Sequence, residues 1–251
     1  MVNLAWQQVW SAKGAAVPAQ QAPAEGTLER LMELGGYTSP TAAGSLEAYE
    51  RHFRYVRERL HIGRGDSVYE VGCGAGALLY WLRDQCARVG GIDFAAPLLE
   101  HARAALPAAD DLEHGDAATV DTDRRYDVVL SNGVFIYFSS ADYARTVTDR
   151  MIAKARRSIG IFDVNDLDRR EEALAARRAA QQNSGSDYSG LDQLFLPREF
   201  FTSIAEEHHL TCQIDDTPTT DSANARYRYH VTMHVEPPRG ERRADPRALA
   251  H

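Results

Sequence analysis

Cysteine is scarce in this sequence, which has only Cys73, Cys86 and Cys212 among its 251 residues. Three scattered thiols cannot build the disulfide framework of a small secreted domain, and they lack the close spacing of structural zinc ligands. We therefore expect a protein of a reducing compartment, the cytoplasm, with no structural metal site.

Long apolar runs and an excess of positive charge are also missing. No stretch approaches 18 uninterrupted apolar residues, and the N-terminus lacks a positive flank followed by an apolar core. The 28 basic residues are outnumbered by 36 acidic ones, which gives a formal charge of −8. Such a balance repels a phosphate backbone unless the basic residues gather in one patch. The richest basic stretch, 168–178, interleaves glutamates and is typical of a solvated helix face. We expect no membrane and no nucleic-acid partner.

What the sequence does contain is an alternation of short apolar runs and amphipathic helices. The predicted strands are 67–72, 87–93, 111–114, 126–132, 158–164, 210–215 and 225–235, and helices are predicted at 76–86, 95–105 and 141–156. Strands joined by helices of this length form right-handed crossovers in a parallel sheet. The last two strands are joined by a link too short for a parallel crossover, so the last strand should be antiparallel. The sequence predicts a doubly wound, Rossmann-like α/β sheet of seven strands.

The N-terminal part has a different pattern. Helices are predicted at 3–13, 26–34 and from 45 onward, with an Ala/Pro/Gln-rich connector at 13–26. We expect residues 1–60 to form a helical lid and 61–235 to form the main domain. Within that domain, residues 165–196 are predicted to be a substrate-lobe insertion, and the tail at 236–251 is predicted to be flexible.

A glycine-rich turn follows the first predicted strand. Gly72, Gly74 and Ala77 fit the spacing of a dinucleotide-binding loop, and Asp93 stands where an acid reaches a ribose diol. Glu70, however, ends the strand two residues before the first glycine. At ~5 Å and an effective dielectric of ~20, its repulsion of each phosphate charge would cost about 3 kcal/mol. A ligand with a cationic amino group and a sulfonium would instead be attracted.

Four segments carry a family resemblance in their order and spacing. They are VYEVGCGAG (68–76), GIDFA (91–95), HGDA (114–117) and YDVVLSNGVFIYF (126–138). Over about residues 45–235 the chain resembles the class I S-adenosylmethionine-dependent methyltransferases. The resemblance implies S-adenosylmethionine as the cofactor, and an antiparallel final strand is also a feature of that family. The residues implied at the cofactor are Glu70, Gly72, Gly74, Gly76, Asp93, Phe94, Asp116, Ala117 and Ser131.

The substrate follows less directly from the residues. The Asn/Asp-Pro-Pro-aromatic motif of base and amide methyltransferases is absent after the fourth strand, where this chain has SNGVFIYF. A catechol-type metal site would need acids at the ends of strands four and five, and the fourth strand supplies none. We therefore expect methyl transfer to an oxygen or nitrogen of a small metabolite, a natural-product precursor in our leading interpretation. The predicted catalytic residues are His52, Asn132 and Tyr137, and the predicted substrate contacts are Tyr37, Asn165, Tyr188 and Asn224, with Trp6 and Trp10 as further lid residues.

Two alternatives stay open at this point. A protein that binds the cofactor without transferring methyl, as a cyclase, an isomerase or a partner-binding module, would equally lack an obvious general base. An NAD-dependent dehydrogenase would use the same glycine spacing. A homodimer is also left open as the oligomeric state.

Overall fold

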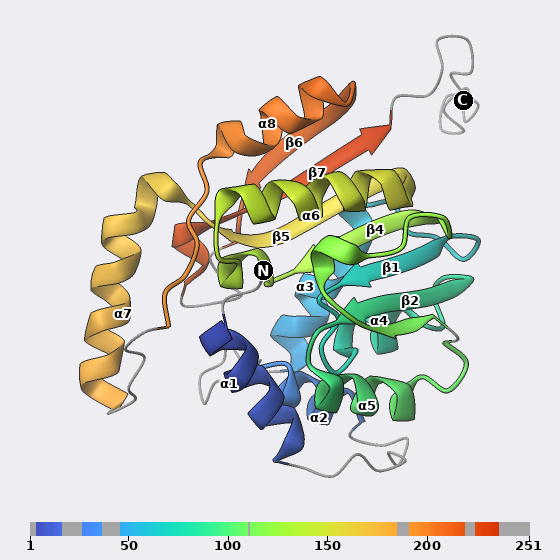
Figure 1. Ribbon diagram of the computed structural model, residues 1–251, viewed down its shortest axis with the longest axis horizontal. Helices are drawn as coiled ribbons and strands as arrows, with labels where there is room; N and C mark the ends of the chain where they lie inside the picture. The colour runs from blue at the N-terminus through green and yellow to red at the C-terminus, as the bar shows by residue number, and fades with distance from the viewer. Residues whose placement is uncertain are drawn as a thin grey trace, which may run out of the picture.

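The computed structural model describes residues 4–16, 27–36, 46–109, 111–184, 191–218 and 224–235. A seven-stranded sheet with the order β3-β2-β1-β4-β5-β7-β6 forms its centre (Figure 1). The strands are β1 (Ser67–Val71), β2 (Arg88–Asp93), β3 (Leu112–His114), β4 (Tyr126–Asn132), β5 (Ala155–Asn165), β6 (Leu210–Asp216) and β7 (Arg228–Val235). The first five strands are parallel, and β7 runs antiparallel between β5 and β6. This arrangement confirms the predicted sheet and its antiparallel last strand.

Helices cover both faces of the sheet. One face packs against α6 (Ala141–Lys154) and α8 (Arg198–Glu207), and the other against α2 (Thr27–Leu34), α3 (Leu46–Arg59), α4 (Ala77–Leu82) and α5 (Ala96–Ala105). All five residues of β1 are buried, as expected for a strand covered on both sides. Each face therefore has its own hydrophobic core.

Two further helices flank these layers. The helix α1 (Leu4–Ala15) packs against α5, where the His101 ring bonds the carbonyl of Gly14 at 3.2 Å. The helix α7 (Arg170–Ser184) extends away from the sheet at the side opposite α4 and α5 (Figure 1). No helix in the described ranges is both long enough and apolar enough to traverse a bilayer.

Some element boundaries differ from those expected. The helix α4 ends at Leu82, because residues 83–87 form a turn that leads directly into β2. The strand β7 begins at Arg228, since Ala225–Tyr227 form a 3₁₀ turn ahead of it. That turn matters below, because it fixes where the first side chain of β7 lies.

Candidate functional site

A cavity of about 390 Å³ opens at the carboxyl edge of the parallel strands. It is lined by the loops after β1, β2 and β4, by Asp163 of β5, by Arg228 of β7 and by residues of α1, α2, α3 and α5. Because β7 is antiparallel, its first residue lies at the same edge as the ends of β1, β4 and β5. This is where an open α/β sheet places its ligands, beside the strand at which the strand order reverses.

The glycine loop brings backbone close to this cavity. Gly72 has φ +79°, and a Cβ there would lie 2.5 Å from Cγ2 of Val134. Gly76 has φ +81° at the start of α4, where a Cβ would lie 3.0 Å from Cβ of Ala102. A side chain at either position would be strained both by the backbone and by its neighbours. The loop therefore needs glycine at positions 72 and 76. Of its three glycines, Gly72 and Gly74 line the cavity and Gly76 does not.

Glu70 places a carboxyl group at the base of the cavity. Its side chain is 4% exposed, and Oε2 is buried without a hydrogen-bond partner in the described part of the chain. Burial raises the pKa of Glu70 well above its usual range, and the nearby charge of Asp93 raises it further. A buried carboxyl with an unused oxygen is costly unless a donor or a cation satisfies it. Oε2 can therefore accept a hydrogen bond from a donor or a cation that a ligand supplies.

Asp93 ends β2 and is held by the glycine loop. Its Oδ2 accepts the backbone N–H of Gly74 and its Oδ1 accepts that of Ala95, both at 2.7 Å. Burial raises the pKa of Asp93, and these two hydrogen bonds counteract part of that shift. Each oxygen keeps a lone pair for a ligand hydroxyl. Phe94, the next residue, also lines the cavity.

His52 and Asn132 both line the cavity and contact each other. His52 on α3 is buried, and its Nε2 lies 2.9 Å from Oδ1 of Asn132 at the end of β4. Because an amide oxygen only accepts, Nε2 must be the donor. In the neutral ring Nδ1 is then the nitrogen that can take a proton. The structure thus brings two of the three predicted catalytic side chains together.

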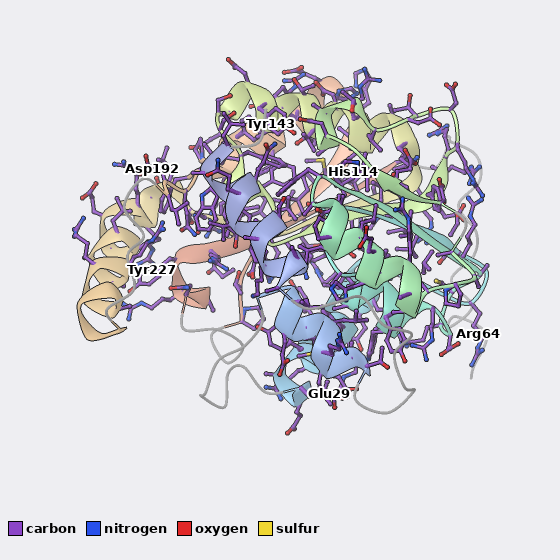
Figure 2. The ribbon with its side chains drawn as sticks, turned by 60° about the horizontal axis from the view of Figure 1, so that its bottom comes forward. Glu29, Arg64, His114, Tyr143, Asp192 and Tyr227 are labelled. Atoms are coloured by element: carbon purple, nitrogen blue, oxygen red, sulfur yellow. The ribbon has the colours of Figure 1, made fainter. Side chains whose placement is uncertain are left out.

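Tyr137, the third predicted catalytic residue, lines the same cavity beneath α1. Its ring lies 4.6 Å from that of Trp6 and 5.5 Å from that of Trp10, measured between centroids. The Trp6 indole N–H donates to the carbonyl oxygen of Asp192 at 2.7 Å, in the segment labelled in Figure 2. Burial raises the pKa of Tyr137, so its hydroxyl stays protonated at neutral pH. The helix α1 therefore packs two aromatic rings against Tyr137, and one of them, Trp10, also lines the cavity.

An ion pair between Asp163 and Arg228 also lines the cavity, and the sequence analysis did not identify it. Nη1 of Arg228 lies 3.2 Å from Oδ2 of Asp163, and both residues line the cavity. Burial alone would raise the pKa of Asp163, but Arg228, His52 and His230 outweigh it and hold that pKa below its usual value. Asp163 has φ +61°, where the β5–β7 register shifts. This irregularity was not visible in the sequence.

Several predicted site residues lie elsewhere. Ser131 is fully buried and donates its hydroxyl to the carbonyl of Val71, because consecutive residues of β4 face opposite sides of the sheet. Asn165 bonds Leu194 and Arg228 rather than lining the cavity. Asp116 caps the turn that begins at Ala117, by accepting from the backbone N–H of Ala118 at 2.8 Å.

Asp116 and Ala117 are not among the cavity-lining residues. Asp116 instead accepts a second hydrogen bond at 2.6 Å, from the hydroxyl of Tyr143, which is labelled in Figure 2. Asn224 does line the cavity. Tyr37 and Tyr188 lie outside the described residues.

Comparisons with known proteins agree with this architecture. Residues 68–157 match the family described as a methyltransferase domain. Magnesium protoporphyrin IX methyltransferase (ChlM) from Synechocystis, crystallised with bound SAH, has a TM-score of 0.60 at 15% identity, over 84% of this chain and 93% of that chain. N-methyltransferase NodS from Bradyrhizobium japonicum has a TM-score of 0.55 at 17% identity, over 84% of this chain and 98% of that chain. At these identities the two structures share the fold.

A curated relative matches over most of this chain. The probable non-canonical nonribosomal peptide synthetase CymA of Salinispora arenicola is 31% identical over 231 residues. That match includes 81% of this chain but spans only 3% of the relative's length. The similarity therefore concerns one small region of a much larger protein.

Proposed function

We propose that the chain is a class I S-adenosylmethionine-dependent methyltransferase and that it methylates an oxygen or nitrogen of a small metabolite, since residues 68–157 match a methyltransferase domain and the fold is that of such enzymes. Its resemblance to a segment of a nonribosomal peptide synthetase supports a substrate from specialised natural-product biosynthesis. The acidic net charge and the partly aromatic cavity favour a small molecule over a nucleic acid.

One observation carries the cofactor assignment, and it is the unpaired Oε2 of Glu70. This carboxyl lies in a cavity whose glycine loop lets a ligand approach the backbone closely. An ammonium group supplies the hydrogen-bond donors and the positive charge that would satisfy this carboxyl. The negative charges of a diphosphate would instead be repelled by the carboxylates of Glu70 and Asp93. These residues therefore fit S-adenosylmethionine better than a dinucleotide.

The residues present suggest how the cofactor would be held. Glu70 would bind its ammonium group, directly or through water, and the carboxylate of Asp93 would accept the ribose hydroxyls. Gly72 and Gly74 would let the backbone approach the methionine part, and Phe94 would lie against the adenine. When bound, S-adenosylmethionine supplies an electrophilic methyl group on a sulfonium.

The chain's own contribution to the chemistry lies at His52 and Asn132. Asn132 fixes the tautomer of His52 by accepting from its Nε2, and Nδ1 can then take the proton that the substrate hydroxyl or amine loses. The aromatic residues of α1 and Tyr137 exclude water from this side. Positioning and water exclusion are the main requirements of an in-line displacement at a methyl group.

Isothermal titration calorimetry with S-adenosylmethionine, S-adenosylhomocysteine and NADH tests the proposal. We expect the first two to bind in the micromolar range and NADH not to bind. Incubation with a metabolite extract should then yield products heavier by one methylene group. Failure of both sulfur nucleosides to bind would refute the proposal, and tight binding without any methyl transfer would favour a non-methylating role.

A further inference from the structure

The Asp163–Arg228 pair leaves two polar atoms unused at the cavity. Nε of Arg228 donates to Asn165 Oδ1 at 3.3 Å and Nη1 to Asp163 Oδ2 at 3.2 Å, while Nη2 has no partner in the described part of the chain. Oδ1 of Asp163 is likewise without a partner there. The pair therefore presents one donor and one acceptor, held side by side.

The backbone fixes this arrangement. Asp163 adopts φ +61° where the register between β5 and β7 shifts, and its N–H donates to Nδ1 of His230 at 3.1 Å. A left-handed aspartate in a strand carries strain that the surrounding structure must hold in place, and such strain is common at ligand sites. Burial lowers the pKa of His230 to about 4, so this ring stays neutral and keeps accepting that bond at physiological pH.

A second, independent group points to a ligand at the same place. Thr217 follows β6, lines the cavity and bonds the carbonyl of Arg228 through its backbone N–H at 3.2 Å. Its side chain is 5% exposed, and Oγ1 is buried without a partner in the described ranges. Buried hydroxyls are nearly always hydrogen-bonded, and a bound molecule can supply the partner that Oγ1 lacks.

We propose that Asp163, Arg228 and Thr217 form a subsite that binds an α-amino-acyl group of the substrate. The carbonyl or carboxylate oxygen accepts from Nη2 of Arg228, and the neighbouring N–H donates to Oδ1 of Asp163. Thr217 takes one of the remaining hydrogen bonds. This inference rests on the proposed function, since it assigns the substrate of the same cavity.

The charge of the subsite supports this class of ligand. The ion pair is neutral overall, so it favours a neutral amide or a zwitterion over a group with a net charge. A phenol or hydrocarbon alone would cover the pair without offering a partner to its donor and its acceptor. An amino-acyl group satisfies both, because its nitrogen and its carbonyl or carboxylate oxygen are attached to the same carbon or to adjacent carbons. The aromatic rings of Trp10, Tyr49 and Tyr137 line the same cavity and can surround its side chain.

The test is a binding panel on the full chain saturated with S-adenosylhomocysteine. Its three arms are the free L-amino acids, their N-acetyl amides, and compounds that carry each side chain alone, such as p-cresol for tyrosine. We expect at least one amino acid to bind as the free acid or as the amide, at least tenfold more tightly than its side-chain compound. The first two arms distinguish a zwitterionic substrate from an acylated one.

Variants then locate the binding. Asp163→Asn is chosen because asparagine tolerates the left-handed conformation, and Arg228→Lys keeps the charge but loses the planar fork. Each should weaken the preferred probe by about tenfold or more while leaving S-adenosylhomocysteine affinity unchanged. Glu171→Gln, which alters a carboxyl that is 84% exposed on α7, is the matched control and should change neither.

The outcomes separate this inference from the proposed function. If S-adenosylhomocysteine binds but no probe is preferred over its side-chain compound, the subsite assignment is wrong. Equal probe affinities in the wild type and both variants would overturn it as well. If probes bind at the pair although S-adenosylhomocysteine does not, the subsite stands and the methyltransferase proposal fails. The probe preference needs no variant, so a misfolded variant leaves the test intact.

Discussion

Replacing Glu70 by glutamine changes one charge at the position that carries the cofactor assignment. The glutamine keeps the shape of the side chain but cannot form an ion pair with an ammonium group. A hydrogen bond to a charged group contributes about 1.5–3 kcal/mol, so affinity for S-adenosylhomocysteine should fall by about tenfold to a hundredfold. 5′-Methylthioadenosine, which has the same nucleoside and thioether but no amino acid, should bind both proteins equally.

The same substitution should stabilise the free protein. Glu70 is buried with an unpaired oxygen, and an unsatisfied buried polar group costs about 1–3 kcal/mol. Because the introduced side-chain amide would also be only partly satisfied, we expect the free energy of unfolding to rise by about 1 kcal/mol. The affinity loss would therefore occur in a protein that is more stable, which excludes misfolding as its cause.

The pH dependence has a defined sign. The pKa of Glu70 is raised in the folded state, so above the ordinary carboxyl pKa of about 4.3 the unfolded chain loses a proton that the folded chain retains. Stability of the wild type should then fall as the pH rises from that value to the folded pKa. The Glu70→Gln variant lacks this contribution, so its advantage should grow with pH.

Calorimetry with the two nucleosides and urea denaturation at pH 5 and pH 8 measure these effects. Glu171→Gln is the control, since its carboxyl is exposed on α7 and should change neither quantity. Equal weakening of S-adenosylhomocysteine and 5′-methylthioadenosine would refute the ammonium assignment. Unchanged affinity for both would refute it as well.

Three other substitutions extend the account. Asp93→Ala should weaken both nucleosides alike, by about 1–3 kcal/mol, when binding is measured by calorimetry, and a loss for only one of them would contradict its place at the ribose. His52→Gln should lower turnover by about a hundredfold or more with S-adenosylhomocysteine affinity retained; unchanged turnover would exclude His52 as the base. Gly72→Ala should reduce the free energy of unfolding by more than Gly133→Ala does, because its Cβ meets Val134 at 2.5 Å whereas Gly133, also at positive φ, has open space around its Cβ. If urea denaturation gave equal losses of unfolding free energy for the two variants, the strained backbone alone would account for the cost and the contact with Val134 would not.

Much of the fold could be predicted from the sequence because the relevant signals are local. Buried runs mark the parallel strands, and a glycine-rich turn marks the start of α4. The short link before the last strand predicted its antiparallel direction, which the structure confirms. These features depend on the period of apolar residues and on linker length, both of which can be read without tertiary contacts.

The direction of single side chains was harder to predict. Ser131 and Asn132 are consecutive in β4, so only one of them can face the cavity, and it is Asn132. The prediction that Ser131 contacts the cofactor while Asn132 takes part in catalysis ignored this alternation. A stricter use of the period of two would have separated them from the sequence alone.

The Asp163–Arg228 pair depends on information that the sequence does not hold locally. The register shift in β5 places Asp163 in the cavity, while Asn165, the predicted contact, bonds other parts of the chain. Arg228 joins the site only because β7 inserts between β5 and β6. Contacts set by a bulge and by long-range strand order appear only once the sheet is assembled.

The most direct test of the central claim is a crystal structure of the protein with S-adenosylhomocysteine bound. We predict the ammonium group within hydrogen-bonding distance of the Glu70 carboxylate or one water away from it, with both ribose hydroxyls on Asp93. A complex in which the amino-acid part lies away from Glu70, or in which the cavity binds a dinucleotide with its phosphates over the glycine loop, would contradict the account.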